Sequence, residues 1–252
     1  MRVKALFNIL VCVVSIPHPT GSAKEKALKS ATILFSEMSP DPDWEDEFNH
    51  WYDTHQIPVR MSVPGFVSAQ RYCDADRPNY LGLFEIASPA VLESEAYEKV
   101  KSQPNAQTAW MLSNALDYAR YAGNEIADQR REGVGDEALD APFLYAVFFS
   151  VPDERVEEFN RWYNEEHIPM LLKCPDWLAI RRFEIFDAEP QPWTHMALHY
   201  LADLAARESA EREAARNTEW YRKLSEEPWF RSSYLIFERI GERFPGKKPE
   251  FA

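Results

Sequence analysis

The chain contains the same motif twice, and this repetition limits the folds that it can adopt. Residues 48–58 read FNHWYDTHQIP and residues 159–169 read FNRWYNEEHIP, at a constant offset of 111 positions. The same offset relates four further pairs, which are Pro64 and Pro175, Phe66 and Trp177, Arg71 and Arg182, and Tyr72 and Phe183. Only two copies occur and each has the size of a small domain. The sequence therefore predicts a fused pair of similar units rather than a solenoid, which needs three or more short repeats.

The composition limits the partners of the chain. Of its 252 residues, 13% are aromatic, and aromatic side chains line pockets for flat ligands as well as cores. The net charge of −13 argues against nucleic acid and against anionic membrane surfaces, because both bind patches rich in Lys and Arg. We therefore expect a small aromatic or hydrophobic substrate as partner, with no nucleic acid and no membrane.

The sequence also indicates that no cofactor or metal is needed. There are only 8 glycines, and neither a Gly-rich phosphate loop nor a Rossmann fingerprint is present, which disfavours nucleotide cofactors. Cys12, Cys73 and Cys174 form no CxxC pair, so buried free thiols are favoured over a disulfide or a zinc site. His195 and His199 share one face of a predicted strand, but the spacing determines no third metal ligand.

The N-terminal segment, residues 1–28, differs from the rest. Arg2 and Lys4 precede an apolar run that ends at Ile16, and small residues follow at 21–23. This is the three-part pattern of a signal peptide, and the run is too short to cross a bilayer. An over-extended start site is the alternative, because the first strand is predicted only from Ala31. We expect a cytoplasmic protein, or an exported one if residues 1–23 are a true signal peptide.

Each copy predicts the element order βαββαβ. In the first unit, residues 29–127, strands are predicted at 31–37, 65–73, 80–86 and 115–121, and helices at 44–56 and 90–102. In the second unit, residues 142–243, strands are predicted at 144–151, 177–186, 195–202 and 233–240, and helices at 153–167 and 203–224. Residues 128–141 are predicted as a linker and residues 244–252 as a tail.

This order predicts an α+β fold class, with two tandem ferredoxin-like βαββαβ units that form a pseudo-dimeric α+β barrel. A four-stranded sheet with helices on one side leaves its other face bare, and two such sheets can bury these faces against each other. We assign Phe66, Leu178, Leu235 and Phe237 to the faces that meet. A homodimer through the outer faces is a further expectation.

The motif resembles the EthD-like branch of the dimeric α+β barrel superfamily. The residues that carry the resemblance are a helix ending in Trp-Tyr-(Asp/Asn)-x-x-His-Ile-Pro and a strand that contains Pro-Gly-Phe-x-x-Ala-x-Arg-Tyr, best seen at 159–169 and 64–72. The resemblance implies a pocket between sheet and helices in each unit. It also places a histidine directly before the hydrophobic residue and proline. His167 matches this position, whereas Gln56 stands there in the first copy.

The predicted catalytic residues are His167, His55, Asp53 and Tyr52. Histidine is the side chain best suited to proton transfer near neutral pH. Asp53, together with Tyr52, can orient His55 or act as the base itself, whereas Asn164 at the equivalent position cannot take a proton. The alternative is structural: a histidine at a helix end interacts with the last carbonyls, and Asp53 is a solvated helix residue.

The predicted substrate-binding residues are Arg71, Arg182, Trp51, Trp162 and Tyr163. Arg71 and Arg182 lie in strands that are covered on both faces, where a charge needs a partner. A substrate carboxylate or phenolate is one such partner, and Glu85 or Glu184 is the internal alternative. For the aromatic residues the alternative is core packing, since adjacent Trp and Tyr face different sides of a helix.

These residues and the resemblance favour a cofactor-free lyase, decarboxylase or isomerase that acts on a small aromatic or hydrophobic acid by histidine acid–base chemistry. Two alternatives stay open: a haem-binding or cofactor-free monooxygenase, and a non-catalytic accessory protein that binds a small molecule. Because the two motifs differ at 53–56 and 164–167, we expect the two pockets to be unequal.

Overall fold

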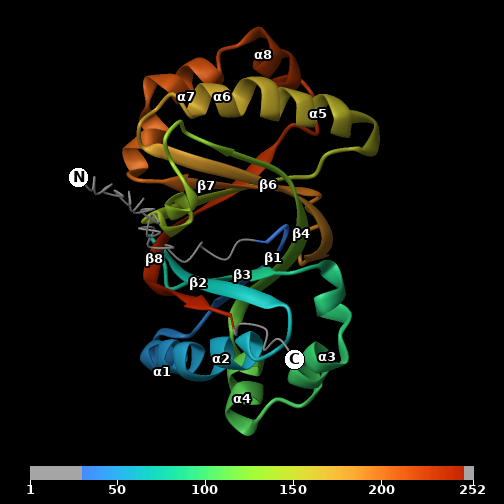
Figure 1. The fold of residues 1–252 in the computed structure, drawn as a ribbon, viewed down its shortest axis with the longest axis vertical. Helices are drawn as coiled ribbons and strands as arrows, with labels where there is room; N and C mark the ends of the chain where they lie inside the picture. The colour runs from blue at the N-terminus through green and yellow to red at the C-terminus, as the bar shows by residue number, and fades with distance from the viewer. Residues whose placement is uncertain (1–29, 247–252) are drawn as a thin grey trace, which may run out of the picture.

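The computed structural model describes residues 30–246, which form one closed barrel of eight antiparallel strands (Figure 1). The order around the barrel is β1-β3-β2-β8-β5-β7-β6-β4, and β4 pairs with β1 to close it. The strands are β1 (Thr32–Ser39), β2 (Phe66–Asp74), β3 (Tyr80–Ile86), β4 (Leu116–Arg130), β5 (Phe143–Phe149), β6 (Trp177–Glu189), β7 (His195–Leu201) and β8 (Ser232–Pro245). The α+β class and the antiparallel barrel agree with the prediction.

Helices cover the barrel at two opposite ends (Figure 1). At one end lie α1 (Glu45–Trp51), α2 (Ile57–Met61), α3 (Glu95–Ser102) and α4 (Ala106–Asn114). At the other end lie α5 (Val156–Trp162), α6 (Ile168–Leu171), α7 (Ala210–Ala215) and α8 (Glu219–Ser225). Five short 3₁₀ turns accompany them, η1 (Pro42–Trp44), η3 (Pro89–Glu93), η4 (Asp136–Asp140), η5 (Asp153–Arg155) and η7 (Leu204–Glu208).

The two halves of the chain complete each other's sheet. The N-terminal half contributes β4-β1-β3-β2 and the C-terminal half β8-β5-β7-β6, in the same relative order. β2 then pairs with β8, and β6 with β4, so no strand of the barrel has a free edge. The N-terminal and C-terminal halves are therefore held together by main-chain hydrogen bonds as well as by side chains.

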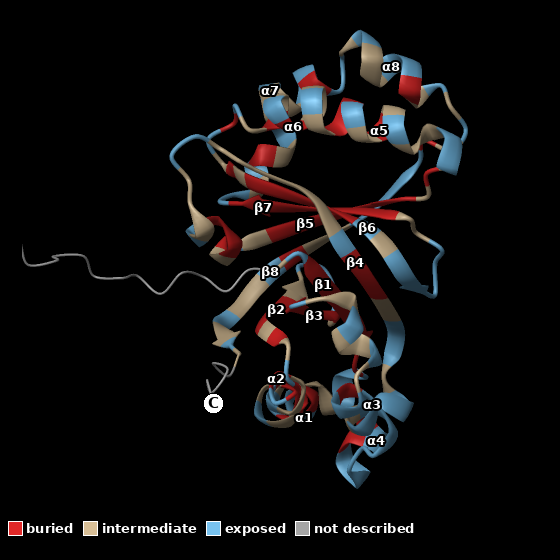
Figure 2. Ribbon diagram, turned by 45° about the vertical axis from the view of Figure 1, so that its right-hand side comes forward, coloured by how far each residue is buried: buried red, intermediate tan, exposed pale blue. Residues whose placement is uncertain are grey.

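The core has three parts, one inside the barrel and one beneath each set of helices. Strands are mostly buried, while the outer faces of the helices are exposed (Figure 2). Phe237 lies inside the barrel, packed on Phe35, as predicted. Phe66 does not: it packs on Phe84 and Tyr97 beneath the helices of the N-terminal half. The strand pairing shifts register between Phe66 and Ser68. Side chains on the two sides of this shift therefore no longer alternate regularly between the faces of the sheet, and the predicted face of Phe66 depended on that alternation.

The predicted helix at 203–224 is wrong as a continuous element. α7 ends at Ala215 and α8 begins at Glu219, because the side chain of Thr218 accepts a hydrogen bond from the backbone of Tyr221 and starts a new helix. A further helix, α4, follows the predicted helix at 90–102. The strands β4 and β8 are longer than predicted since each pairs with a strand of the other half.

Some predictions lie outside what the structure describes. Residues 1–29 are not described, so the signal peptide or over-extended start remains a prediction. β4 continues to Arg130, three residues past the predicted boundary at 127, and the division into units and linker likewise stays a prediction. Within residues 30–246, no helix is long and apolar enough to cross a membrane.

A buried ion pair joins the two halves inside the barrel. Arg181 of β6 and Glu85 of β3 are almost fully buried and bond through two pairs of atoms, of which Nη2 to Oε2 spans 3.1 Å. Glu125 of β4 also accepts from Arg181 Nε at 2.6 Å. Glu85, one of the internal partners considered for Arg71 and Arg182, thus pairs with the neighbouring arginine instead.

We expect Glu85→Gln to lower the free energy of unfolding by about 3 kcal/mol, because Arg181 then keeps a buried charge that only Glu125 offsets. Urea denaturation measures this loss. The control is Asp187→Asn, which removes an exposed partner of Arg120 and should cost less than about 1 kcal/mol. Equal losses in the two variants would contradict a special role for the buried pair.

Candidate active site

Both copies of the motif contain one π-helical turn. After α1 and α5 the chain continues as η2 (Tyr52–Gln56) and η6 (Tyr163–His167), in which the backbone N–H of Ile57 bonds to the Tyr52 carbonyl and that of Ile168 to the Tyr163 carbonyl. Such turns are rare and occur frequently at functional sites. The sequence predicted a regular helix here. The π turns contain the motif tyrosine in both halves and end at Gln56 and His167.

Tyr163 is the centre of the C-terminal site. It is buried, and its hydroxyl lies 3.0 Å from Nε2 of His199, on β7. The other nitrogen of this ring, Nδ1, accepts a hydrogen bond from the indole of Trp177 at 3.1 Å. Burial lowers the pKa of His199 well below its ordinary value, so the ring is neutral near pH 7.

His167 lies beside this group in an aromatic enclosure. Its ring is 4.7 Å from that of Trp162 and 5.1 Å from that of Tyr163, and it stacks on Tyr221 of α8. Burial lowers the pKa of His167 to about 3, and nearby arginines act in the same direction, while a hydrogen bond with the Ala215 backbone opposes them. Nδ1 is buried and has no partner among the described residues. His167 is thus a neutral ring with one unused nitrogen.

Arg182 is a buried cation without a carboxylate. Its guanidinium donates to the side-chain oxygens of Asn164 at 2.8 Å and Asn160 at 2.6 Å, and it lies 4.3 Å above the Tyr163 ring. Within residues 30–246 it forms no ion pair, and burial lowers the pKa of Arg182 to about 10. A buried charge that only neutral groups contact favours the arrival of an anion.

In the N-terminal half, the corresponding arginine, Arg71, has a carboxylate partner within the chain. Arg71 donates to Asp53 at 2.9 Å and to Asn49 at 2.7 Å, so a carboxylate stands where the C-terminal half has Asn164. The Arg71 guanidinium lies 4.6 Å from the centre of the Tyr52 ring, as in the other half. The predicted base Asp53 is therefore the ion-pair partner of the predicted substrate-binding Arg71.

The N-terminal half also lacks both histidines of the C-terminal site. Gln56 stands 111 positions before His167. Strand pairing places Phe84 opposite Leu34 and His199 opposite Tyr145. Because Leu34 and Tyr145 are again 111 positions apart, Phe84 is the counterpart of His199. The hydroxyl of Tyr52 is buried, and its neighbouring hydrogen-bonding side chain is Ser36 rather than a histidine.

His55 makes a contact that has an equivalent in the second copy. Its Nε2 lies 3.1 Å from the side chain of Asn105, which caps α4. Glu166, 111 positions later, accepts from Thr218, which caps α8, at 2.6 Å. This position thus connects the π turn to the N-terminus of α4 in one half and of α8 in the other, which favours the structural interpretation of His55.

Trp51 and Trp162, both predicted to bind substrate, differ in whether the indole nitrogen has a hydrogen-bond partner. The indole of Trp51 donates to Thr108 of α4 at 3.2 Å, which makes it a packing anchor. The indole nitrogen of Trp162 is buried and has no partner in residues 30–246. Within residues 30–246, buried polar atoms without a partner occur in both halves, at Gln56 Nε2 and Arg71 Nε as well as at Trp162 Nε1 and His167 Nδ1.

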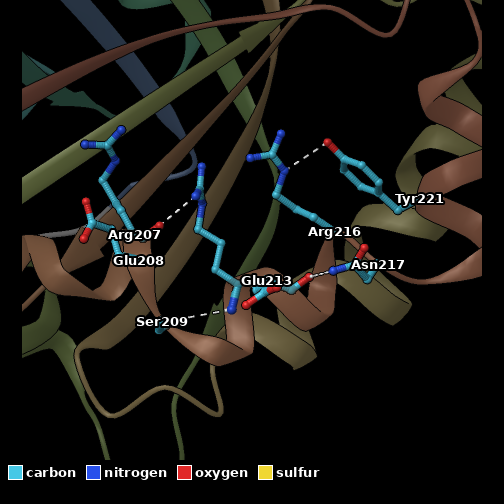
Figure 3. A pocket seen from close by; sticks show the side chains of 8 residues that line it. Arg207, Glu208, Ser209, Glu213, Arg216, Asn217 and Tyr221 are labelled. Carbon is cyan, nitrogen blue, oxygen red and sulfur yellow. Dashed lines mark hydrogen bonds between the residues drawn. The ribbon is translucent and has the colours of Figure 1, made fainter.

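An open cavity of about 360 Å³ lies beside α7 and is lined by residues between Arg207 and Tyr221. It borders the site through Tyr221, whose ring stacks on His167, whereas Tyr163, His167 and Arg182 do not line it. Arg207 and Arg216 extend toward the same side of it (Figure 3), and Arg212 also lines it. None of these arginines pairs with a carboxylate in the described residues; Arg216 donates to the hydroxyl of Tyr221, whose ring stacks on His167. Sequence reasoning missed this cavity, and its only signal was the three arginines in a charged segment.

The remaining histidine, His195, is buried on the same face as His199, as the strand spacing predicted. Its Nδ1 lies 2.9 Å from the Thr194 hydroxyl, and burial, with Arg182, lowers the pKa of His195 to about 4. No group of His, Cys, Asp and Glu in residues 30–246 has the arrangement of a metal site.

Known structures resemble this chain in fold. No protein-family model and no curated protein sequence matches it. A protein described as anthrone oxidase-like superposes with a TM-score of 0.66 at 12% identity, over 88% of this chain and 96% of that one. A candidate monooxygenase from Fusobacterium nucleatum subsp. nucleatum gives 0.54 at 10% identity, over 86% and 95%. A mutant chlorite dismutase from Candidatus Nitrospira defluvii in complex with cyanide gives 0.55 at 8% identity, over 84% and 92%. The chain has the dimeric α+β barrel fold, as the motif resemblance implied.

Exchanging the residues that face the two arginines tests the electrostatic difference between the halves. Asn164→Asp should raise the free energy of unfolding by about 1 kcal/mol, because it gives Arg182 a carboxylate. Asp53→Asn should lower it by about 1 kcal/mol, a modest value since half of the Asp53 side chain is exposed. Urea denaturation at neutral pH measures both, and a loss in Asn164→Asp would show that Arg182 is already satisfied.

Stability should depend on pH through the buried histidines. Their folded pKa values lie below the ordinary value of 6.5, so the unfolded chain binds more protons between these limits. This contribution to stability is then fully present above about pH 6.5 and is lost as the pH falls toward 4 for His195 and toward 3 for His167. His167→Gln introduces the residue that the N-terminal half has at this position. In this pH window it should lower the slope of the unfolding free energy against pH by about 1.4 kcal/mol per pH unit. An unchanged slope would mean that His167 is not buried as a neutral ring.

Proposed function

We propose that the chain is an enzyme that binds a small aromatic anion in its C-terminal half and exchanges a proton with it through a neutral histidine. The observation that carries this proposal is Arg182, a buried cation that no carboxylate of the described chain neutralises. A carboxylate or phenolate is the ligand group that a guanidinium binds best. The surrounding aromatic rings suit a flat ligand.

The charge state of His167 selects the direction of proton transfer. Because the pKa of His167 lies at about 3, the ring is not protonated near neutral pH and does not act as a general acid in the resting enzyme. The unpaired Nδ1 can accept a proton when the anion that forms near Arg182 offsets the burial and the positive charges that hold the pKa of His167 low. We therefore assign a first step in which the substrate loses a proton to His167 and the resulting anion is held near Arg182.

The resemblance in fold favours an oxidation as the second step. Two of the structures reported above are described as anthrone oxidase-like and as a candidate monooxygenase. A deprotonated, electron-rich aromatic compound can react with dioxygen without a cofactor, so our preferred function is a cofactor-free oxidase or monooxygenase. The lyase, decarboxylase or isomerase expected from the sequence shares the first step and differs in consuming no oxygen.

Haem binding, the other oxidative alternative, fits the packing poorly. An axial histidine must face a space for the macrocycle. Both nitrogens of His199 are already bonded. Aromatic rings lie 4.7 Å and 5.1 Å from the His167 ring, and Phe159 lies 5.4 Å from that of His195, so side chains fill the space that haem would need.

The tandem organisation belongs to this proposal. We infer that the halves are two ferredoxin-like units of an EthD-like barrel, since they share the motif offset and the strand order. In such a pair one pocket suffices for turnover. The N-terminal half keeps the framework with Asp53, Gln56 and Phe84, and the C-terminal half keeps the site.

The test combines binding and turnover. Thermal-shift screening with hydroxybenzoic acids and with anthrone should find stabilising ligands, and an oxygen electrode then measures oxygen uptake with each. His167→Gln should lower the rate of the folded enzyme by about 100-fold or more. His55→Gln is the matched control and should cost about 1 kcal/mol of stability with little change in rate.

Three outcomes separate the candidates. Oxygen uptake in proportion to substrate loss supports the oxidase or monooxygenase. Substrate loss without oxygen uptake supports the lyase, decarboxylase or isomerase. Binding without turnover supports the accessory protein, and the absence of any aromatic ligand would overturn the proposal.

A further inference from the structure

The hydrogen bonds of His199 determine where its proton lies. An indole N–H only donates, so Nδ1 of His199, which lies 3.1 Å from Trp177 Nε1, must be an acceptor without a proton. Burial keeps the ring neutral, so its single proton is on Nε2. The Trp177 side chain thus selects one tautomer of His199.

The tautomer in turn determines the role of the Tyr163 hydroxyl. Nε2–H donates to the hydroxyl oxygen across 3.0 Å, so this oxygen is the acceptor of the pair. The hydroxyl hydrogen of Tyr163 must then point elsewhere, and no residue between 30 and 246 accepts it. A buried donor that remains unused beside the unpaired cation Arg182, 4.3 Å from the ring centre, favours an anionic acceptor.

The N-terminal half lacks this arrangement. Its tyrosine, Tyr52, has Phe84 in place of the histidine, and a Cβ at Gly82 would lie 2.3 Å from the Tyr52 hydroxyl. The counterpart of Gly82 is Ala197, since Ser36 lies opposite Gly82 and Val147 opposite Ala197. The Ala197 methyl group occupies this place in the C-terminal half, so the Tyr163 hydroxyl cannot take the position that the Tyr52 hydroxyl has in the N-terminal half.

We propose that Tyr163 donates its hydroxyl hydrogen to the anionic oxygen of the bound aromatic ligand, and that His199 is the positioning residue that turns the hydroxyl toward it. The inference rests on the proposed function and makes it more specific: the ligand carries a phenolate, enolate or carboxylate oxygen next to its ring. The charge of Arg182 attracts the anion, and the hydrogen bond from Tyr163 orients it. His199 does not contact the ligand.

The test uses the full chain and 4-nitrophenol as the probe, because its absorbance reports whether the bound form is the phenolate. Tyr163→Phe and His199→Phe should each weaken phenolate binding by about tenfold. The double variant should lose no more than either single variant, since both remove the same hydrogen bond. His199→Gln keeps an N–H near the Tyr163 oxygen and should restore most of the affinity.

A second measurement needs no ligand. Nitrogen-15 NMR of the histidines in the free protein should show an unprotonated Nδ1 and a protonated Nε2 for one ring, and this signal should disappear in His199→Phe. Phe84→His is the matched control in the N-terminal half and should leave phenolate binding unchanged.

The outcomes distinguish this inference from the proposed function. Full affinity in His199→Phe, additive losses in the double variant, or a proton on Nδ1 would each overturn the positioning role while binding of the anion stands. If the unmodified protein binds neither 4-nitrophenolate nor any aromatic acid, the proposed function fails, and this inference fails with it.

Discussion

The closure of one barrel by two halves of a single chain is the constraint on which the rest of the structure depends. β2 bonds to β8 and β6 to β4, so each half supplies the strand partner that the other needs. The ion pair between Glu85 and Arg181 crosses the same boundary inside the barrel, where neither charge could stay buried alone. Aromatic and aliphatic side chains fill the interior of the barrel, and the cavity of about 360 Å³ lies outside it, beside α7 of the C-terminal half.

Within this common framework the two halves treat one buried guanidinium differently. Arg71 is neutralised by Asp53, whereas Arg182 contacts the amides of Asn160 and Asn164 and aromatic rings, and it pairs with no carboxylate in residues 30–246. Both halves have an α-helix followed by a π turn, and the two turns differ at this position in one side chain, Asp53 or Asn164. The ion pair stabilises the N-terminal half, whereas in the C-terminal half the buried charge of Arg182 is left for an anionic ligand to neutralise.

The neutral histidines follow from the same packing. Aromatic rings around His167 and His199 exclude water, and the neighbouring arginines further disfavour a second positive charge. This arrangement costs the protein acid stability, and it leaves Nδ1 of His167 unprotonated and without a hydrogen-bond partner in residues 30–246. A site with fixed cations and neutral bases is suited to making and holding an anion.

The sequence by itself predicted the α+β class, the order of the eight strands, and the correspondence of Arg71 with Arg182 and of Gln56 with His167, because these depend only on periodicity and on a constant offset. It did not determine the π turns, the break between α7 and α8, or the inward position of Arg181 against Glu85. Nor did it indicate that Trp177 and His199 act on Tyr163, since these three side chains come from two strands and a helix. Contacts between elements depend on strand register and helix packing, and only the tertiary structure decides which polar atoms meet and which are left without a partner.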